Sequence, residues 1–168
     1  MKQFDKGWYI IYTKPRYENK LAEELRKMEI EAFVPAVNQK RKWHDRMKMV
    51  ECVLFPSYVF VRLENASQLL NSSKAVGFVT YVKFGKLIAR VRDNVIANVK
   101  MILKEAEGVQ VSYQPFFSGA KVVILTGEFS GLECEIIDFE GEEKVLVRID
   151  ILNTSLLMNM PSDSLSVA

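Results

Sequence analysis

The sequence predicts an α+β sandwich followed by a small β-barrel, in a chain of 168 residues. In the first two thirds, strand-like and helix-like segments alternate around one long hairpin, an order that favours a sheet covered by helices. The last third contains short β-rich runs separated by glycine turns, which is typical of a small barrel. The charge balance reverses between these parts, and the length suffices for one medium and one small domain.

The N-terminal part begins with a buried strand and an amphipathic helix. Trp8–Tyr12 is a continuous apolar run, which predicts a strand covered on both faces. A helix is expected over 17–28, because Leu21, Leu25 and Met28 recur at the spacing of one helical face. This order of strand and helix is the one that a helix-covered sheet requires.

A long hairpin is expected in the middle of this part. Its strands are placed at 31–37 and 49–63, and the basic stretch Asn38–Lys48 is placed at its tip. Pro56 interrupts the second strand, since proline removes a donor from the ladder. The other elements expected here are a short helix at 68–74, a strand at 76–82, a turn at 84–86 and a helix for which Asp93 is the N-cap.

A linker separates the two expected domains. Residues 109–117 lack a helical stripe and contain Pro115, so the N-terminal domain is placed at 1–108 and the barrel at 118–168. Valine and isoleucine alternate through 145–151, which favours a strand there and argues against a helical alternative. The barrel strands are expected at 121–125, 133–139, 145–149 and 155–160.

Charge is distributed unevenly along the chain. Met1–Glu107 contains 20 Lys and Arg against 12 Asp and Glu, a balance of +8, whereas Gly108–Ala168 contains 3 against 9, a balance of −6. Such an asymmetry predicts that the first part binds a polyanion and the second does not. Mutual attraction of two tethered domains would explain the same numbers.

Composition argues against several function classes. The apolar runs are too short to span a bilayer, and Met1–Gly7 lacks the apolar core of a secretion signal. Cys52 and Cys134 fall in different expected domains, which excludes a disulfide framework and favours a reducing cytoplasm. The single histidine, His44, has no second ligand at zinc spacing and no buried setting for a catalytic triad. We therefore expect a cytoplasmic protein without a membrane segment, enzymatic activity, cofactor or metal.

An aromatic strand is the first candidate binding feature. In the run Leu54–Val61, alternation places Pro56, Tyr58 and Phe60 on one face and Val59 with Val61 on the other. Both faces can be internal core. Alternatively, one face is open and forms an apolar patch with aromatic anchors, which suits the side of a partner helix.

Basic residues form the second candidate feature, in two clusters. Mixed with an exposed aromatic such as Trp43, they can hold phosphates and stack a base. A solvated hairpin tip is the alternative, and no motif for reading base edges is present. The first cluster is Lys14, Arg16, Lys20 and Lys27, and the second is Lys40, Arg41, Lys42, Arg46 and Lys48.

These residues carry a resemblance to a known family. Trp8–Arg16 and Phe55–Val61 resemble the N-terminal domain of NusG-type transcription elongation factors, called the NGN domain. The stretches Ser118–Ile124 and Gly127–Glu133 resemble the KOW motif of their C-terminal barrel. The resemblance covers nearly the whole chain and implies a ferredoxin-like sandwich followed by an SH3-like barrel. The matching KOW residues are Gly119, Val122, Gly127, Phe129 and Gly131.

Details of the match resemble specialised paralogues of the RfaH or UpxY kind, which antiterminate particular operons, often for surface polysaccharides. Ser57 stands where housekeeping members usually have glycine. The His-Thr-Thr element by which RfaH contacts the second pincer of polymerase is missing, and Gln68–Ser73 occupies that region. Cys134 replaces a later glycine of the KOW motif.

The resemblance implies a monomeric elongation and antitermination factor with three partners. Its N-terminal domain would grip the clamp helices of RNA polymerase through Tyr12, Phe55, Pro56, Tyr58, Phe60 and Ile96. Lys14, Arg16, Lys20 and Lys27 would lie near the non-template DNA strand, with Lys40, Arg41 and Lys42 as further nucleic-acid contacts. The barrel would dock to a small-subunit ribosomal protein or to the factor Rho near Ile151, Leu152 and Leu156.

Two rival functions remain at this point. A ribosome- or RNA-associated KOW protein would use the basic hairpin as an RNA clamp, with steeply salt-dependent binding. A small hydrolase or nuclease on a ferredoxin-like sheet would need a metal-dependent activity that no residue here indicates.

Overall fold

The computed structural model describes residues 4–105, 108–112, 119–125 and 129–159. It divides into two compact units, Met1–Asp93 and Asn94–Ala168, which are described separately below. No helix in these described ranges is long and apolar enough to cross a membrane.

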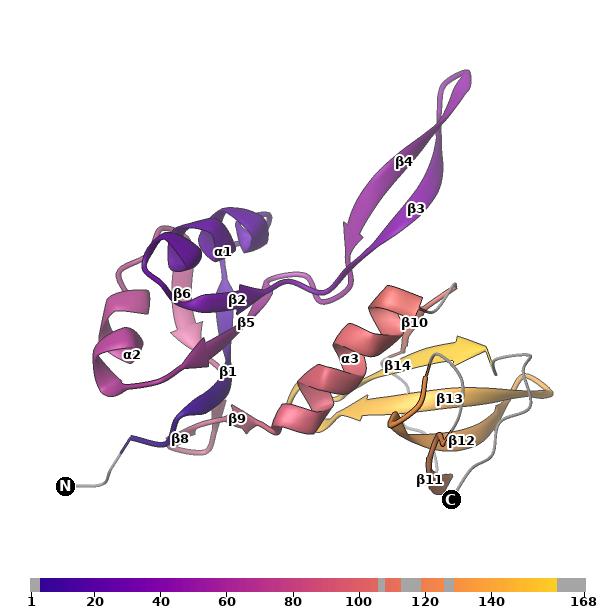
Figure 1. The fold of residues 1–168 in the computed structure, drawn as a ribbon. Helices are drawn as coiled ribbons and strands as arrows, with labels where there is room; N and C mark the ends of the chain where they lie inside the picture. Colours follow the sequence, from indigo (N-terminus) through magenta and orange to yellow (C-terminus); the bar gives the residue numbers. More distant parts are fainter. Residues whose placement is uncertain (1–3, 106–107, 113–118, 126–128, 160–168) are drawn as a thin grey trace. The chain divides into compact units, whose positions relative to one another are not determined.

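The first unit is built on an antiparallel sheet in the order β2-β5-β1-β6 (Figure 1). One helix connects β1 to β2 and another connects β5 to β6, which is the split β-α-β arrangement of the ferredoxin-like fold. The expected α+β sandwich is therefore confirmed. The elements are β1 (Gly7–Thr13), α1 (Glu18–Lys27), β2 (Glu31–Phe33), β5 (Tyr58–Leu63), α2 (Ala66–Ser72), β6 (Phe78–Tyr81) and a short β9 (Arg90–Val91) that also pairs with β1.

The core of this unit lies between the helices and one face of the sheet. Leu21 and Leu25 of α1 are fully buried against Ile11 of β1 and Val59 and Val61 of β5. Alternation along a strand sends these sheet residues toward the helices and their neighbours to the opposite face. The burial of Leu21 and Leu25 and the parity of β5 are thus as the sequence predicts, whereas Met28, the third residue of the expected stripe, lies just after the end of α1 and is exposed.

The hairpin differs from the expected one in length and in where it ends. It pairs β3 (Ala36–Trp43) with β4 (Arg46–Val53) along eight residues, so only His44 and Asp45 form the tip. The placement of all of 38–48 at the tip was wrong, because no glycine or proline interrupts 36–53 and long basic side chains are tolerated on a ribbon exposed to water. In Figure 1 this ribbon extends away from the sheet of its own unit.

Two turns delimit the remaining strands of the unit. Pro56 and Ser57 form a turn that separates β4 from β5, so the expected 49–63 strand is two strands in different sheets. A second, small hairpin joins β7 (Lys83–Phe84) to β8 (Leu87–Ile88), which confirms the turn expected at 84–86.

The second unit contains a helix and a five-stranded antiparallel sheet in the order β10-β14-β13-β12-β11. The four strands expected for a small barrel are present, and β10 adds a fifth from within the expected linker. Gln110 to Ser112 pair with β14, so this stretch has ladder partners that its own sequence does not reveal. The elements are α3 (Asp93–Glu105), β10 (Gln110–Ser112), β11 (Ala120–Val123), β12 (Glu133–Phe139), β13 (Glu142–Ile149), a 3-10 turn η1 (Asp150–Leu152) and β14 (Thr154–Asn159).

Helix α3 belongs to the second unit in this structure. Asn98 Nδ2 donates to the carbonyl oxygen of Glu133 at 2.8 Å, and Asn94 Nδ2 donates to the Glu133 carboxylate at 2.7 Å. In this structure the two compact units divide after Asp93, the first residue of α3, whereas the sequence predicts a domain boundary after this helix, at residue 108; that domain boundary stays a prediction.

Candidate functional site

Two tyrosines pair across the end of the first unit's sheet. Tyr12 of β1 lies opposite Tyr58 of β5, and their ring centroids are 5.5 Å apart at an interplanar angle of 59°. Tyr12 is 39% exposed, and Tyr58 is half-buried. Tyrosine has an apolar ring and a polar hydroxyl. Such a pair can therefore be exposed to water in the free protein and still bury apolar area against a partner.

The turn that precedes Tyr58 is fixed to helix α1. The backbone N–H of Ser57 donates to Glu18 Oε1 at 2.7 Å, and Glu18 itself is buried. The Ser57 carbonyl accepts from the backbone N–H of Thr13 at 2.9 Å. Ser57 has a left-handed φ of 67°, which glycine adopts without strain, and this accounts for the expected glycine at the position. The Glu18 carboxylate, at the start of α1, also interacts favourably with the helix dipole.

A second set of hydrogen bonds fixes the turn after β1. Thr13 Oγ1 donates to the carbonyl oxygen of Gly77 at 2.6 Å, and the backbone N–H of Lys14 donates to the same oxygen at 2.9 Å. Gly77 has a φ of 93°, and a Cβ there would lie 2.8 Å from the Tyr17 ring. Lys14 and Arg16 are exposed on this turn.

These turns bring aromatic and basic side chains to one end of the sheet. Because Thr13 bonds to Ser57 and Lys14 follows Thr13, the two turns are neighbours. We call this region the strand-end surface, and it consists of Tyr12, Lys14, Arg16, Pro56 and Tyr58.

The other residues predicted to contact polymerase are buried. Phe55 and Phe60 are 1% and 0% exposed, and their ring centroids are 6.0 Å apart. Ile96 is 2% exposed and lies on α3 in the second unit. Phe60 is therefore interior, whereas Tyr58 reaches the surface, and the use of this face for binding a partner stays a prediction.

The predicted basic residues are only partly gathered. Lys20 lies on α1 with its ammonium 5.3 Å from the centroid of the Tyr17 ring, near the start of the helix. Lys27 is the last residue of α1, about 14 Å along the helix axis from Glu18 at 1.5 Å per residue. Lys40, Arg41 and Lys42 all lie exposed on β3, away from the strand-end surface.

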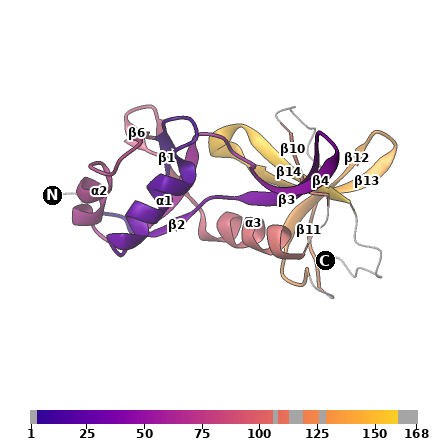
Figure 2. The ribbon, with the colours of Figure 1, turned by 90° about the horizontal axis from the view of Figure 1, so that it is seen from above.

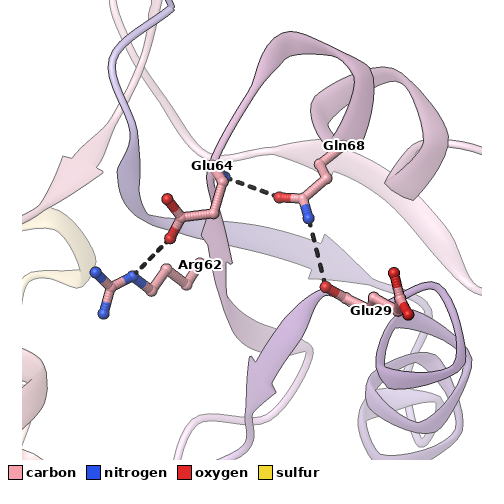
Figure 3. A network of polar contacts seen from close by, with 4 residues as sticks. All are labelled: Glu29, Arg62, Glu64 and Gln68. Carbon is pink, nitrogen blue, oxygen red and sulfur yellow. Dashed lines mark hydrogen bonds and ion pairs between the residues drawn. The ribbon is translucent and has the colours of Figure 1, made fainter.

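A polar network lies at the start of α2 (Figure 3). This is the region of Gln68–Ser73, where the His-Thr-Thr element of RfaH is missing. Asn65 caps the helix by accepting from the backbone N–H of Gln68 at 2.9 Å, and Gln68 Oε1 accepts from the backbone N–H of Glu64 at 2.8 Å. Arg62 pairs with Glu64 at 3.1 Å, with both side chains more than 40% exposed. Exposed pairs of this kind contribute little, so this network caps a helix and forms no reactive group.

One of the KOW-like residues, Gly119, contacts an ion pair between Glu135 and Arg148 that the sequence alone did not indicate. Arg148 Nε and Nη2 donate to the two carboxylate oxygens of Glu135 at 2.7 and 3.0 Å, which is a bidentate pair. Chiefly because Arg148 hydrogen-bonds to it, the pKa of Glu135 lies below its ordinary value. The backbone N–H of Gly119 donates to Glu135 Oε2 at 3.0 Å. A Cβ on Gly119 would lie 2.2 Å from the carbonyl oxygen of Ile136.

The other residues of the KOW-like motif have positions that explain them by packing, strand pairing or backbone conformation. Phe129 is buried, Val122 is half-buried and paired with Cys134, and Gly131 has a φ of 89°. Gly127 lies outside the described residues. Burial raises the pKa of the Cys134 thiol to about 11, so this cysteine stays protonated and is no nucleophile.

Comparison of the sequence with known proteins identifies a family and several relatives. A family model described as "Transcription termination factor nusG" matches residues 6–100. The chain is 26% identical over 160 residues to the transcription termination/antitermination protein NusG of Lactococcus lactis, covering 85% of this chain and 83% of that one. It is 24% identical over 163 residues to NusG of Streptococcus pyogenes serotype M1, covering 88% of each.

Two solved structures are similar over most of the chain. The structure described as "Domain interaction in Thermotoga maritima NusG" is 27% identical, with a TM-score of 0.47, and the match covers 92% of this chain and 94% of that one. The MjSpt4:Spt5 complex is 13% identical, with a TM-score of 0.31, and the match covers 92% of this chain and 99% of that one.

Proposed function

This chain belongs to the NusG family, whose members are transcription factors and not enzymes, and from that premise we propose that it binds RNA polymerase through the strand-end surface. The observation that carries the proposal is the Tyr12–Tyr58 pair at the end of the sheet, in which Tyr12 is exposed and Tyr58 is half-buried. The proposal extends the family's role in transcription termination and antitermination to a direct contact between this chain and RNA polymerase.

The geometry supports an interface with an apolar centre. Aromatic side chains that combine apolar area with a hydroxyl are enriched among the residues that dominate interface energies. Glu18 and Gly77 fix the two adjoining turns through hydrogen bonds, so little conformational entropy is lost when a partner binds. On this proposal Phe55 and Phe60 support the surface from inside, and they do not touch the partner.

Lys14 and Arg16 add a cationic border to the same surface. A polymerase-bound factor placed near an exposed DNA strand would hold phosphates with such side chains, and this contact would weaken as salt rises. Lys20 lies near the start of α1, which follows the turn of Lys14 and Arg16, and it adds a further cation to this basic region. Lys27, at the far end of α1, is not needed in this version of the contact.

The proposed role is elongation and antitermination in the cytoplasm, on particular operons as in the RfaH- and UpxY-like paralogues that the chain resembles. Bridging of the polymerase clamp would favour the closed, transcribing state by differential binding. For the barrel, a ribosomal protein or Rho is the proposed partner. Leu152 is half-buried and could contact it, whereas Leu156 is fully buried in β14.

Replacing both tyrosines by threonine tests the contact. Tyr12→Thr with Tyr58→Thr keeps β-forming residues in both strands but removes the rings, and we expect at least a ~30-fold loss of affinity for core RNA polymerase, since a dominant interface residue contributes about 2 kcal/mol or more. Fluorescence titration of labelled protein with polymerase measures the affinity.

Phe84→Thr is the matched control for this experiment. Phe84 is 88% exposed on β7 of the same unit, so the variant removes an aromatic ring from a strand elsewhere on the surface. Its affinity should equal that of the unmodified chain. Equal affinities of the control and the double tyrosine variant would mean that the strand-end surface is not the contact.

A further inference from the structure

The β3–β4 hairpin has two chemically different faces. In an antiparallel ladder, residues that pair across the strands share a face, and the next pair lies on the opposite face. Arg41 pairs with Lys48 and Trp43 pairs with Arg46, so these four side chains lie on one face. We call it the indole face.

The opposite face has a different character. Lys40 pairs with Met49, Lys42 pairs with Met47, and Asn38 pairs with Glu51. The three nucleic-acid contacts predicted as a run in β3 are therefore divided, with Arg41 on the indole face and the two lysines on this one. We call it the methionine face.

Charge and aromatic character coincide only on the indole face. Among the eight residue pairs of the hairpin, that face has three cations and no carboxylate, whereas the methionine face has two lysines and Glu51; Asp45 lies outside these pairs, in the tip. Trp43 is 66% exposed. Within the described part of the chain, neither arginine nor Lys48 makes an ion pair, so all three cations are available to an anionic ligand.

We propose that the indole face binds a single strand of nucleic acid, with a base stacked on Trp43 and phosphates held by Arg41, Arg46 and Lys48. An unpaired base presents a free π-face to the indole, which a base inside a duplex does not. Arg41 and Lys48 face each other about 5 Å apart across the strands, and Lys48 and Arg46 lie about 7 Å apart along β4, a spacing that can follow a phosphate backbone.

This site is separate from the polymerase contact. Its residues lie on the hairpin, and the strand-end surface lies at the end of β1 and β5. It can therefore be tested with the purified full-length chain and no polymerase, so its failure would leave the proposed function untouched.

Tryptophan fluorescence reports binding directly. The chain has two tryptophans, and Trp8 is 3% exposed whereas Trp43 is 66% exposed. An oligodeoxythymidylate of about 12 nucleotides is expected to quench the Trp43 emission by stacking, and a duplex of the same length is expected to bind at least about tenfold more weakly. With three phosphate contacts, the slope of log K against log salt should be about −2.

Two double variants of equal net charge distinguish the two faces, because each of them replaces two cations by glutamine on one face only. Arg41→Gln with Lys48→Gln should lower affinity at least about tenfold and make the salt slope shallower by about 1.4. Lys40→Gln with Lys42→Gln removes the same charge from the methionine face and should leave both quantities nearly unchanged. Equal effects of the two double variants would overturn the proposal, because they would indicate diffuse attraction.

The stacking contact has its own matched pair of variants. Trp43→Ala should lower affinity about 5- to 100-fold, measured with a labelled oligonucleotide, whereas Met47→Ala on the opposite face should not. An oligouridylate of equal length should bind to within about tenfold of the DNA strand, since neither stacking nor phosphate contact reads the 2′-hydroxyl. Undiminished binding by Trp43→Ala, or a larger preference for one sugar, would contradict this assignment.

Discussion

Phe60→Ala is expected to lower the free energy of unfolding of the N-terminal unit by about 3–5 kcal/mol. Phe60 is 0% exposed in β5, which pairs with β1 on one side and β2 on the other. Its ring lies 6.0 Å from that of Phe55 and 6.2 Å from that of Phe33. Truncation would leave a cavity among aromatic rings that a sheet cannot collapse to fill. Urea unfolding of the full-length chain, followed by near-ultraviolet circular dichroism, measures the loss.

Tyr58→Ala is the control, two residues away on the same face of the same strand. Because Tyr58 is only half-buried, its truncation should cost clearly less than that of Phe60. Equal losses for the two variants would contradict the division of this face into interior and surface. The comparison also matters for function, since a polymerase-binding defect of a Phe60 variant would report unfolding and not a lost contact.

Gly119→Ala is expected to destabilise the second unit by about 2–3 kcal/mol. A Cβ at this position would lie 2.2 Å from the carbonyl oxygen of Ile136 in β12, and a backbone atom cannot move aside as a flexible side chain can. The Gly119 N–H also donates to Glu135, which bonds to Arg148, so a shift of the strand would disturb this hydrogen bond as well. Amide hydrogen exchange of β12 and β13 would measure the change in this unit alone.

Gly131→Ala separates steric clash from backbone strain. Gly131 has a φ of 89°, but a Cβ there would meet nothing within 4 Å. Its replacement should cost about 1 kcal/mol from the left-handed conformation alone. If Gly119→Ala cost no more than this, the close approach of β11 to β12 would not be the reason for glycine in the motif.

Local pattern predicted most of the fold. The stripe of Leu21 and Leu25 places α1 correctly, and alternation of Val59 and Val61 with Phe60 assigns the two faces of β5. The glycine-separated runs predict four strands of the second unit to within a few residues. These features depend on periodicity over one element, which the sequence carries in full.

Features that depend on distant contacts were not predictable. Gln110–Ser112 form a strand only because β14 supplies their partners, and Glu18 is buried because a turn some forty residues later donates to it. Likewise, sequence proximity groups Lys40, Arg41 and Lys42 in one basic cluster with Arg46 and Lys48, while the register of the hairpin divides this cluster between two faces. The burial of Phe55 and the exposure of Tyr12 also follow from packing, which the residue types alone do not determine.

The central claim is that the Tyr12–Tyr58 end of the sheet touches RNA polymerase, and site-specific photocrosslinking tests it most directly. A photoreactive phenylalanine derivative in place of Tyr12 should crosslink to a polymerase subunit when the purified proteins are mixed, because Tyr12 is exposed at this surface. The same group in place of Phe84 should not crosslink, although Phe84 is more exposed. Crosslinking from position 84 with none from position 12 would contradict the account.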